Sequence, residues 1–391
     1  MHSLRLILSN TRYFAVVWVF CSLNIMIGTW VLYIPHVKHK LQLNDAQLGI
    51  ALFCLALGLM SFMPVIPWIT KRFGLGRTTI VGIVLFAMAF LLPLLTPSYI
   101  MLCLALYIVG VFSGVTDIAM NALVSELEQK DGVSFMAAAH GFFSSGGVIG
   151  AVLGSLLMGL VTVPQYHMLL IALVVIVSNL LLCKHYIKQE ETPAVNKKEK
   201  RSFKAFKPLM AMAFIAMIVM GSEGAIEHWS TLYLTEIVQI ENNSLTGLGF
   251  IMFSACMTTG RFFGDMISNH FGSIKVVLLG CVCALAGYIL VAIGTLITAT
   301  LGFGIVGLGL SVIIPELIRI AGKTEGISAS AGISFVSGVG FIGFSLGPVI
   351  LGFISDNFGL KMSFMFLLFS TVLAIMVSAF RARHLSLTKS Y

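Results

Sequence analysis

The sequence predicts an all-α membrane protein whose twelve transmembrane helices form two pseudo-symmetric six-helix bundles, with both termini in the cytoplasm. Three observations lead to this prediction: the composition, the apolar segments and the distribution of basic residues. Of 391 residues, 58% are hydrophobic and only 10% are charged, and the mean hydropathy is +1.00. A soluble chain covers its surface with far more charge. The composition therefore excludes a globular cytosolic enzyme, a secreted disulfide scaffold and a disordered protein.

Twelve segments are long and apolar enough to cross a membrane. A crossing of about 30 Å needs roughly 20 apolar residues at a rise of about 1.5 Å per residue. The predicted spans cover residues 13–34, 46–69, 78–96, 99–124, 136–161, 165–186, 208–235, 245–268, 275–294, 298–318, 328–353 and 361–381. Because the first apolar run exceeds the usual length of a signal-peptide core, we expect no cleavable signal peptide.

The basic residues predict the orientation of these spans. If the N-terminus is cytoplasmic, every Lys and Arg except Lys38, Lys40 and Lys361 falls on the cytoplasmic side. Cytoplasmic loops of membrane proteins carry an excess of Lys and Arg, so twelve spans with both termini inside are favoured. Topology thus accounts for the net charge of +8, and we expect no nucleic-acid partner.

A polar segment and an internal repeat predict the domain organisation. The segment "KQEETPAVNKKEKR" is typical of a flexible linker, and it divides the chain into an N-terminal bundle (1–187), a linker (188–207) and a C-terminal bundle (208–391). Similar motifs recur in the same order in both halves: "TWVLY" and "HWSTLY" in spans 1 and 7, "KRFG" and "NHFG" ending at Gly74 and Gly272, and the glycine-rich runs 144–154 and 337–347. Such repeats are typical of secondary transporters.

The chain resembles transporters of the major facilitator superfamily over nearly its whole length. The motifs "DIAMN", "HGFFSSGG", "EGAIEHWSTLYL" and "GLGLSVIIPEL" are similar to those of orphan bacterial inner-membrane carriers related to the fucose–proton symporter and to rhizopine-type transporters. The resemblance implies alternating access in a multi-pass protein of the bacterial inner membrane. It also implies a monomer without enzymatic activity or cofactor, whose partners are a small solute, protons and the lipid bilayer.

Two motifs of the superfamily are retained in part. Between spans 2 and 3, "PWITKRFGLGR" keeps Arg72 and Gly74 but has Lys71 where the family pattern has Asp, which removes the basis for the usual contact of that Asp with a helix end. In the second half, "GRFFGD" resembles the related segment and contains Arg261 and Asp265. The resemblance implies that Arg72, Arg261 and Asp265 have gating or structural roles.

Ionisable residues inside predicted spans are the candidates for proton coupling, because each costs a few kcal/mol to insert into hydrocarbon. Asp117 in span 4 has Asn121 one turn further on the same face. Glu223 and Glu227 in span 7 are also one turn apart, which disfavours simultaneous ionisation of both. His140 lies near the inner end of span 5 and is a candidate relay to Asp117. Structural hydrogen bonds to neighbouring helices or carbonyls are the alternative for each.

Polar and aromatic residues of the spans are the candidates for substrate contact: Asn24, Trp30, Tyr33, Asn121, Trp229 and Tyr233. Asn24 is a candidate donor to a solute hydroxyl. The four aromatic residues are placed equivalently in spans 1 and 7, and they are interpreted either as an interfacial belt or as an outer gate that stacks on a ring-shaped solute. Glu316 and Arg319, three residues apart in span 10, are expected to form an ion pair at the cytoplasmic gate.

We therefore expect secondary active transport, by proton symport, of a small polar solute that is sugar-like or cyclitol-like. The resemblance implies that fucose symporters use an acid in the first span. The first span of this chain has no acid, so fucose itself is not supported as substrate. A proton-driven drug or metabolite efflux antiporter is the alternative, although span 5 lacks the Gly-Pro pair and span 4 the basic residue that such antiporters tend to carry. A receptor or scaffold is a third reading, against which the cost of the buried carboxylates argues.

Overall fold

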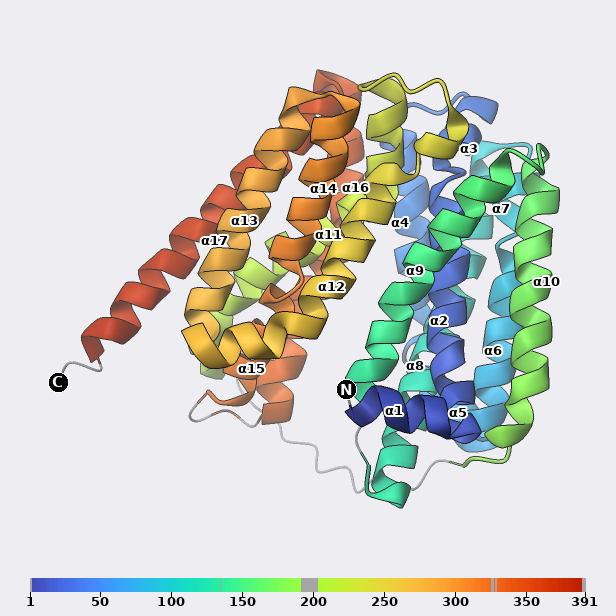
Figure 1. The fold of residues 1–391 in the computed structure, drawn as a ribbon, viewed down its shortest axis with the longest axis horizontal. Helices are drawn as coiled ribbons and strands as arrows, with labels where there is room; N and C mark the ends of the chain where they lie inside the picture. Colours follow the sequence, from blue (N-terminus) through green and yellow to red (C-terminus); the bar gives the residue numbers. More distant parts are fainter. Residues whose placement is uncertain (1, 134, 191–202, 325–326, 328, 389–391) are drawn as a thin grey trace. The chain divides into compact units, whose positions relative to one another are not determined.

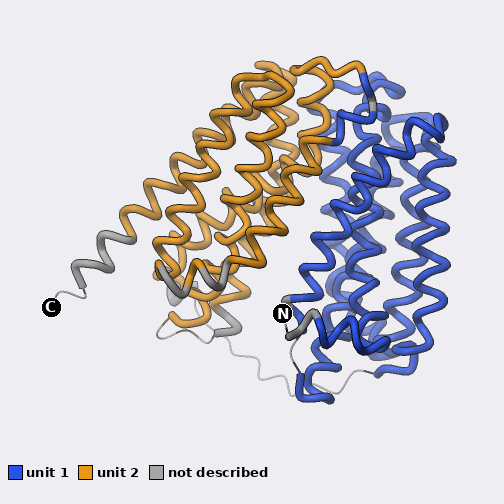
Figure 2. Tube along the Cα trace, in the orientation of Figure 1, with its two compact units in different colours: residues 1–195, 242–247 blue, residues 196–241, 248–391 orange. Residues whose placement is uncertain are grey.

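The computed structural model describes residues 2–133, 135–190, 203–324, 327 and 329–388, and every regular element in these ranges is helical (Figure 1). The chain forms two compact units (Figure 2): unit 1 contains residues 1–195 and 242–247, and unit 2 contains residues 196–241 and 248–391. Of the expected linker, residues 191–202 lie outside the described residues.

Unit 1 contains long helices packed side by side, joined by short helices and tight turns. Its elements are α1 (His2–Ser9), α2 (Thr11–Val31), α3 (Ile34–Lys40), α4 (Asp45–Phe62), α5 (Ile66–Phe73), α6 (Leu75–Ala89), α7 (Leu92–Leu95), α8 (Tyr99–Asp131), α9 (Met136–Met158), α10 (Pro164–Leu182), the 3-10 helix η1 (Cys183–His185) and the loop helix η3 (Asn243–Leu245). Local sequence sets their ends: Asn44 and Gln47 form a capping box on α4, and Ser98 caps α8.

Unit 2 is built in the same way from the second half of the chain. Its elements are η2 (Phe203–Leu209), α11 (Met210–Glu236), α12 (Leu248–Phe271), α13 (Ser273–Ile293), α14 (Leu296–Leu310), α15 (Ile313–Gly322), α16 (Ala329–Phe358) and α17 (Leu360–Thr388). In each unit the first long helix packs against the fifth of that unit's six expected spans: α2 packs against α9, and α11 packs against α16.

Eleven helices of the described chain are long and apolar enough to cross a membrane, so this is a multi-pass membrane protein. They correspond to all of the expected spans except the eighth. That span falls on α12, whose described apolar part, Leu248–Phe263, is shorter than the others.

Two glycines explain why "KRFG" and "NHFG" recur in the two halves. Gly74 precedes α6 with φ = 87° and ψ = 152°, and Gly272 precedes α13 with φ = 81° and ψ = 148°. Positive φ is strained for residues with a side chain and accessible to glycine. The repeated motif therefore encodes the same sharp turn between two helices in each unit.

Close helix contact explains the second repeated motif, the glycine-rich runs of α9 and α16. A Cβ atom on Gly150 would lie 2.2 Å from the carbonyl oxygen of Ile25 in α2, and one on Gly343 would lie 2.0 Å from the carbonyl oxygen of Met217 in α11. Side chains are excluded at both positions, so the backbones of the paired helices approach closely, as is typical of small-residue contacts in membranes.

Candidate functional site

An ion pair joins the middle of α11 to α12 in unit 2. Glu223 Oε1 lies 3.1 Å from Arg261 Nη2, and the side chains are 22% and 33% exposed, respectively. Arg261 thus lies inside α12, within the eighth expected span. Removing charged groups from water is costly, and neutralising one partner of such a pair leaves the charge of the other uncompensated. Proton binding to Glu223 would therefore change the electrostatics of both residues.

Glu227 lies one helical turn after Glu223 on α11 and is partly buried. The next residue, His228, is 7% exposed, and its Nδ1 atom has no hydrogen-bond partner among the described residues. Unit 2 therefore gathers two carboxylates, a guanidinium and an imidazole on α11 and α12. The sequence reading missed His228, although its position directly after Glu227 is a signal that could have identified it.

Asp117 in α8 is the carboxylate of unit 1 that lies inside a predicted span, and it is partly buried. The side-chain amide of Asn121 donates to the Asp117 backbone carbonyl at 2.8 Å and to Asp117 Oδ1 at 3.2 Å. These bonds hold the two side chains together on one face of the helix. A carboxylate fixed by a single amide donor retains free lone pairs for a proton or a solute hydroxyl.

His140 near the start of α9 is exposed. Its ring contacts the ring of Phe20 in an edge-on arrangement, with 5.5 Å between the centroids. Phe20 belongs to α2, so His140 lies at the close contact between α2 and α9. The relay to Asp117 that the sequence suggests stays a prediction.

The four repeat-related aromatic side chains lie inside their own units. Trp30 and Trp229 are 1% and 0% exposed, and neither indole nitrogen has a hydrogen-bond partner in the described structure. The hydroxyl of Tyr33 contacts Nδ1 of His167 in α10, while the hydroxyl of Tyr233 donates to the Val291 carbonyl at 2.6 Å. Buried rings of this kind are packed within the bundles.

Asn24 also bonds within its own unit. Its Nδ2 atom donates to the Phe143 carbonyl of α9 at 2.9 Å, and its side chain is buried. One amide donor is thus used to hold α2 against α9. A direct contact of Asn24 with a solute stays a prediction.

The other residues expected to have gating or structural roles lie on different helices. Arg72 is exposed at the end of α5. Glu316 is buried and lies 3.3 Å from Arg319, which also donates to the Ser268 hydroxyl of α12 at 2.8 Å. Arg319 therefore links α15 to α12. The side chain of Asp265 lies outside the described part of the chain.

Within the described residues, no group of three or more His, Cys, Asp or Glu side chains has an arrangement that could hold a metal ion. Each unit has its own group of titratable and amide side chains: Asp117 and Asn121 in α8 of unit 1, and Glu223, Glu227 and Arg261 in α11 and α12 of unit 2. Such groups bind protons and hydrogen-bond polar solutes.

Comparison with known proteins gives a consistent family assignment. The model of the Major Facilitator Superfamily matches residues 15–327. An uncharacterized MFS-type transporter of Yersinia pestis is 29% identical over 346 residues, which cover 86% of this chain and 87% of the relative. Membrane protein MosC of Rhizobium meliloti is 28% identical over 377 residues, with 95% and 90% covered.

Solved structures share the fold at low sequence identity. A crystal structure of the nucleoside transporter NupG superposes with a TM-score of 0.75 at 14% identity, covering 95% of this chain and 99% of NupG. This likeness concerns the arrangement of the helices.

Proposed function

The chain belongs to the Major Facilitator Superfamily, and we propose that it is a proton-coupled symporter that moves a small polar solute by alternating access. Members of this superfamily are secondary transporters and not enzymes, so transport of a small solute across a membrane follows from the family. Proton coupling and the polar nature of the solute are what we propose beyond the family assignment.

The Glu223–Arg261 ion pair is the observation that carries the proton-coupling proposal. Both residues lie in long helices of unit 2, and their charged atoms are 3.1 Å apart. Because inserting such charges costs free energy, a purely structural element would be built more cheaply from apolar residues. Both side chains are partly exposed, and access of protons and solute to them is part of the proposal.

The chemistry of coupling follows from the charges of this cluster. Ionised Glu223 neutralises Arg261; a proton on Glu223 ends that attraction and frees the guanidinium to reorient or to bind a solute oxygen. Glu227 lies one turn from Glu223, and two carboxylates this close together disfavour simultaneous ionisation of both. Proton binding and solute binding thus act on the same group, which is the requirement for thermodynamic linkage between them.

Asp117 and Asn121 support a polar solute, sugar-like or cyclitol-like. Their carboxylate and amide oxygens accept hydrogen bonds from hydroxyl groups, and their shared face on α8 presents both to one ligand. NupG, which has the same fold, is by its title a nucleoside transporter, and a nucleoside also carries hydroxyl groups on a ring.

Proteoliposomes containing the purified chain test the proposal. We expect Glu223→Gln and Asp117→Asn each to abolish solute-driven proton flux, because the amides have nearly the same shape and cannot bind the proton. Glu236→Gln is the matched control, since Glu236 is an exposed residue at the end of the same helix α11. The substrate would first be found by a thermal-shift screen of sugars, cyclitols, amino acids and nucleosides.

Two results would contradict this proposal. Full proton flux in both amide variants would exclude Glu223 and Asp117 as coupling sites. In vesicles of one orientation, solute movement opposite to the proton gradient would identify an efflux antiporter in place of a symporter.

A further inference from the structure

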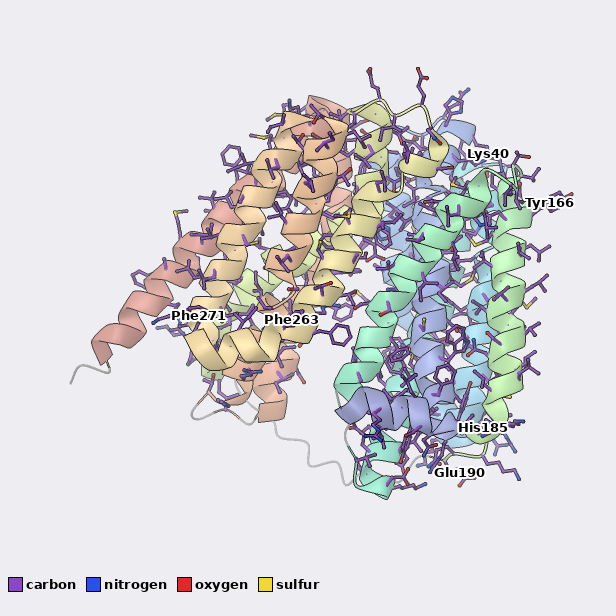
Figure 3. All side chains as sticks on the ribbon, viewed as in Figure 1. Lys40, Tyr166, His185, Glu190, Phe263 and Phe271 are labelled. Carbon is purple, nitrogen blue, oxygen red and sulfur yellow. The ribbon has the colours of Figure 1, made fainter. Side chains whose placement is uncertain are left out.

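Five exposed basic side chains gather at one end of unit 1. Lys71 and Arg72 end α5, Arg77 lies in the first turn of α6, and Lys184 and Lys188 follow α10. We call these residues the basic collar. Figure 3 shows His185 and Glu190 at this end of the unit, with Lys40 and Tyr166 at the opposite end. The charge distribution of the sequence predicts that the collar faces the cytoplasm.

Backbone docking brings the two parts of the collar together. The Gly76 backbone amide donates to the Gln189 carbonyl at 3.0 Å, and a Cβ atom on Gly76 would lie only 2.1 Å from the Tyr186 carbonyl oxygen. Arg12 of α2 also donates to the Gln189 side chain at 3.3 Å. The segment that carries Lys184 and Lys188 is therefore held against the turn between α5 and α6.

The collar has a large excess of positive charge. Within the described ranges, no acidic side chain forms an ion pair with any of its five residues. The carboxylate side chain of Glu190 lies beside the turn: its Cγ atom is 3.9 Å from the position of a Cβ atom on Gly74. Lys71 stands where the superfamily pattern has Asp, so a positive charge replaces a negative one at this position.

Exposed aromatic rings lie beside these charges. Trp68 is 64% exposed and Phe73 is 53% exposed. Trp68 is three residues before Lys71 and four before Arg72, so the three side chains share one face of α5. An indole next to Lys and Arg is typical of the headgroup layer of a membrane, where the ring contacts acyl chains and the cations contact phosphates.

We propose that the basic collar, with Trp68, is a binding site for anionic phospholipid headgroups of the inner leaflet. The charge selects anionic over zwitterionic lipids, and the exposed ring favours a lipid over a free anion. The site is distinct from the residues proposed for proton coupling, so its failure would leave the transport proposal intact.

Lipid titration of the purified full-length chain tests the site. Native mass spectrometry would compare phosphatidylglycerol with phosphatidylcholine, and inorganic phosphate would compete as a free anion. Each basic residue near an anionic surface changes lipid affinity about fivefold, which corresponds to about 1 kcal/mol. We therefore expect the triple variant Lys71→Gln, Arg72→Gln, Arg77→Gln to bind phosphatidylglycerol about a hundredfold more weakly, with little change for phosphatidylcholine.

Two variants serve as controls. Lys275→Gln with Lys323→Gln removes exposed charges from unit 2 and should leave binding of phosphatidylglycerol to the collar unchanged. If the triple variant does not fold, Lys184→Gln with Lys188→Gln tests the other part of the collar, with an expected loss of about 25-fold on the same scale. Equal affinity for the two lipids, an unchanged triple variant, or full competition by inorganic phosphate would each overturn the proposal.

Discussion

Asn24 lies inside α2, and its amide holds that helix to α9. The bond to the Phe143 carbonyl is 2.9 Å long, and Gly147 of α9 leaves room for the Asn24 side chain: a Cβ atom there would lie 2.8 Å from Asn24 Nδ2. The polar residue and the glycine are thus a matched pair between two helices.

Replacement of Asn24 by Ala should lower the free energy of unfolding by about 0.5 to 2 kcal/mol, because an interhelical hydrogen bond in a membrane is lost. Thermal unfolding in detergent measures this change. Asn121→Ala is the comparison, since that amide bonds within its own helix and should cost less. Unchanged stability together with a higher KM for the solute would instead make Asn24 a solute ligand.

The contact of α11 with α16 depends on small residues along both helices. A Cβ atom on Gly347 would lie 2.4 Å from the Gly221 carbonyl oxygen, and one on Gly343 would meet Met217. The same arrangement between α2 and α9 shows that the repeated glycines belong to repeated contacts between elements.

We expect Gly343→Val to lower the free energy of unfolding by about 1 to 3 kcal/mol, because the added side chain overpacks the contact between α11 and α16. Gly338→Ala in the same helix is the control, because a Cβ atom there meets nothing within 4 Å. Thermal unfolding of both variants measures the difference. Equal stability of the two would show that the backbones separate at little cost.

The number of membrane crossings is a property of the whole molecule. Eleven helices meet the criteria of length and apolarity in the described residues, while α12 has a shorter apolar part. If α12 also crosses, the chain has twelve spans and both ends lie on one side, as the basic residues predict.

Reporter fusions decide between the two counts. With twelve spans, alkaline phosphatase should be active when fused after residue 41 or residue 242, and green fluorescent protein should be fluorescent after residue 272 or residue 388. The physical reason is that phosphatase folds only outside the cytoplasm and the fluorescent protein only inside. Reporters after 242 and 272 on the same side would show that α12 does not cross.

The sequence by itself determined the features that depend on local composition. Hydropathy along the chain identified eleven of the twelve predicted spans among the described helices, because insertion depends on each segment's own residues. The repeat of Gly74 and Gly272 could be recognised because a positive φ leaves a strong signature at one position.

Only the tertiary structure decided which side chains meet across helices. Glu223 and Arg261 are 38 positions apart, and their pairing depends on the rotation and register of α11 against α12, which no local pattern specifies. The same holds for Trp30 and Trp229: their positions in spans 1 and 7 left an interfacial belt and an outer gate open, and only the packing of neighbouring helices shows that both rings are buried.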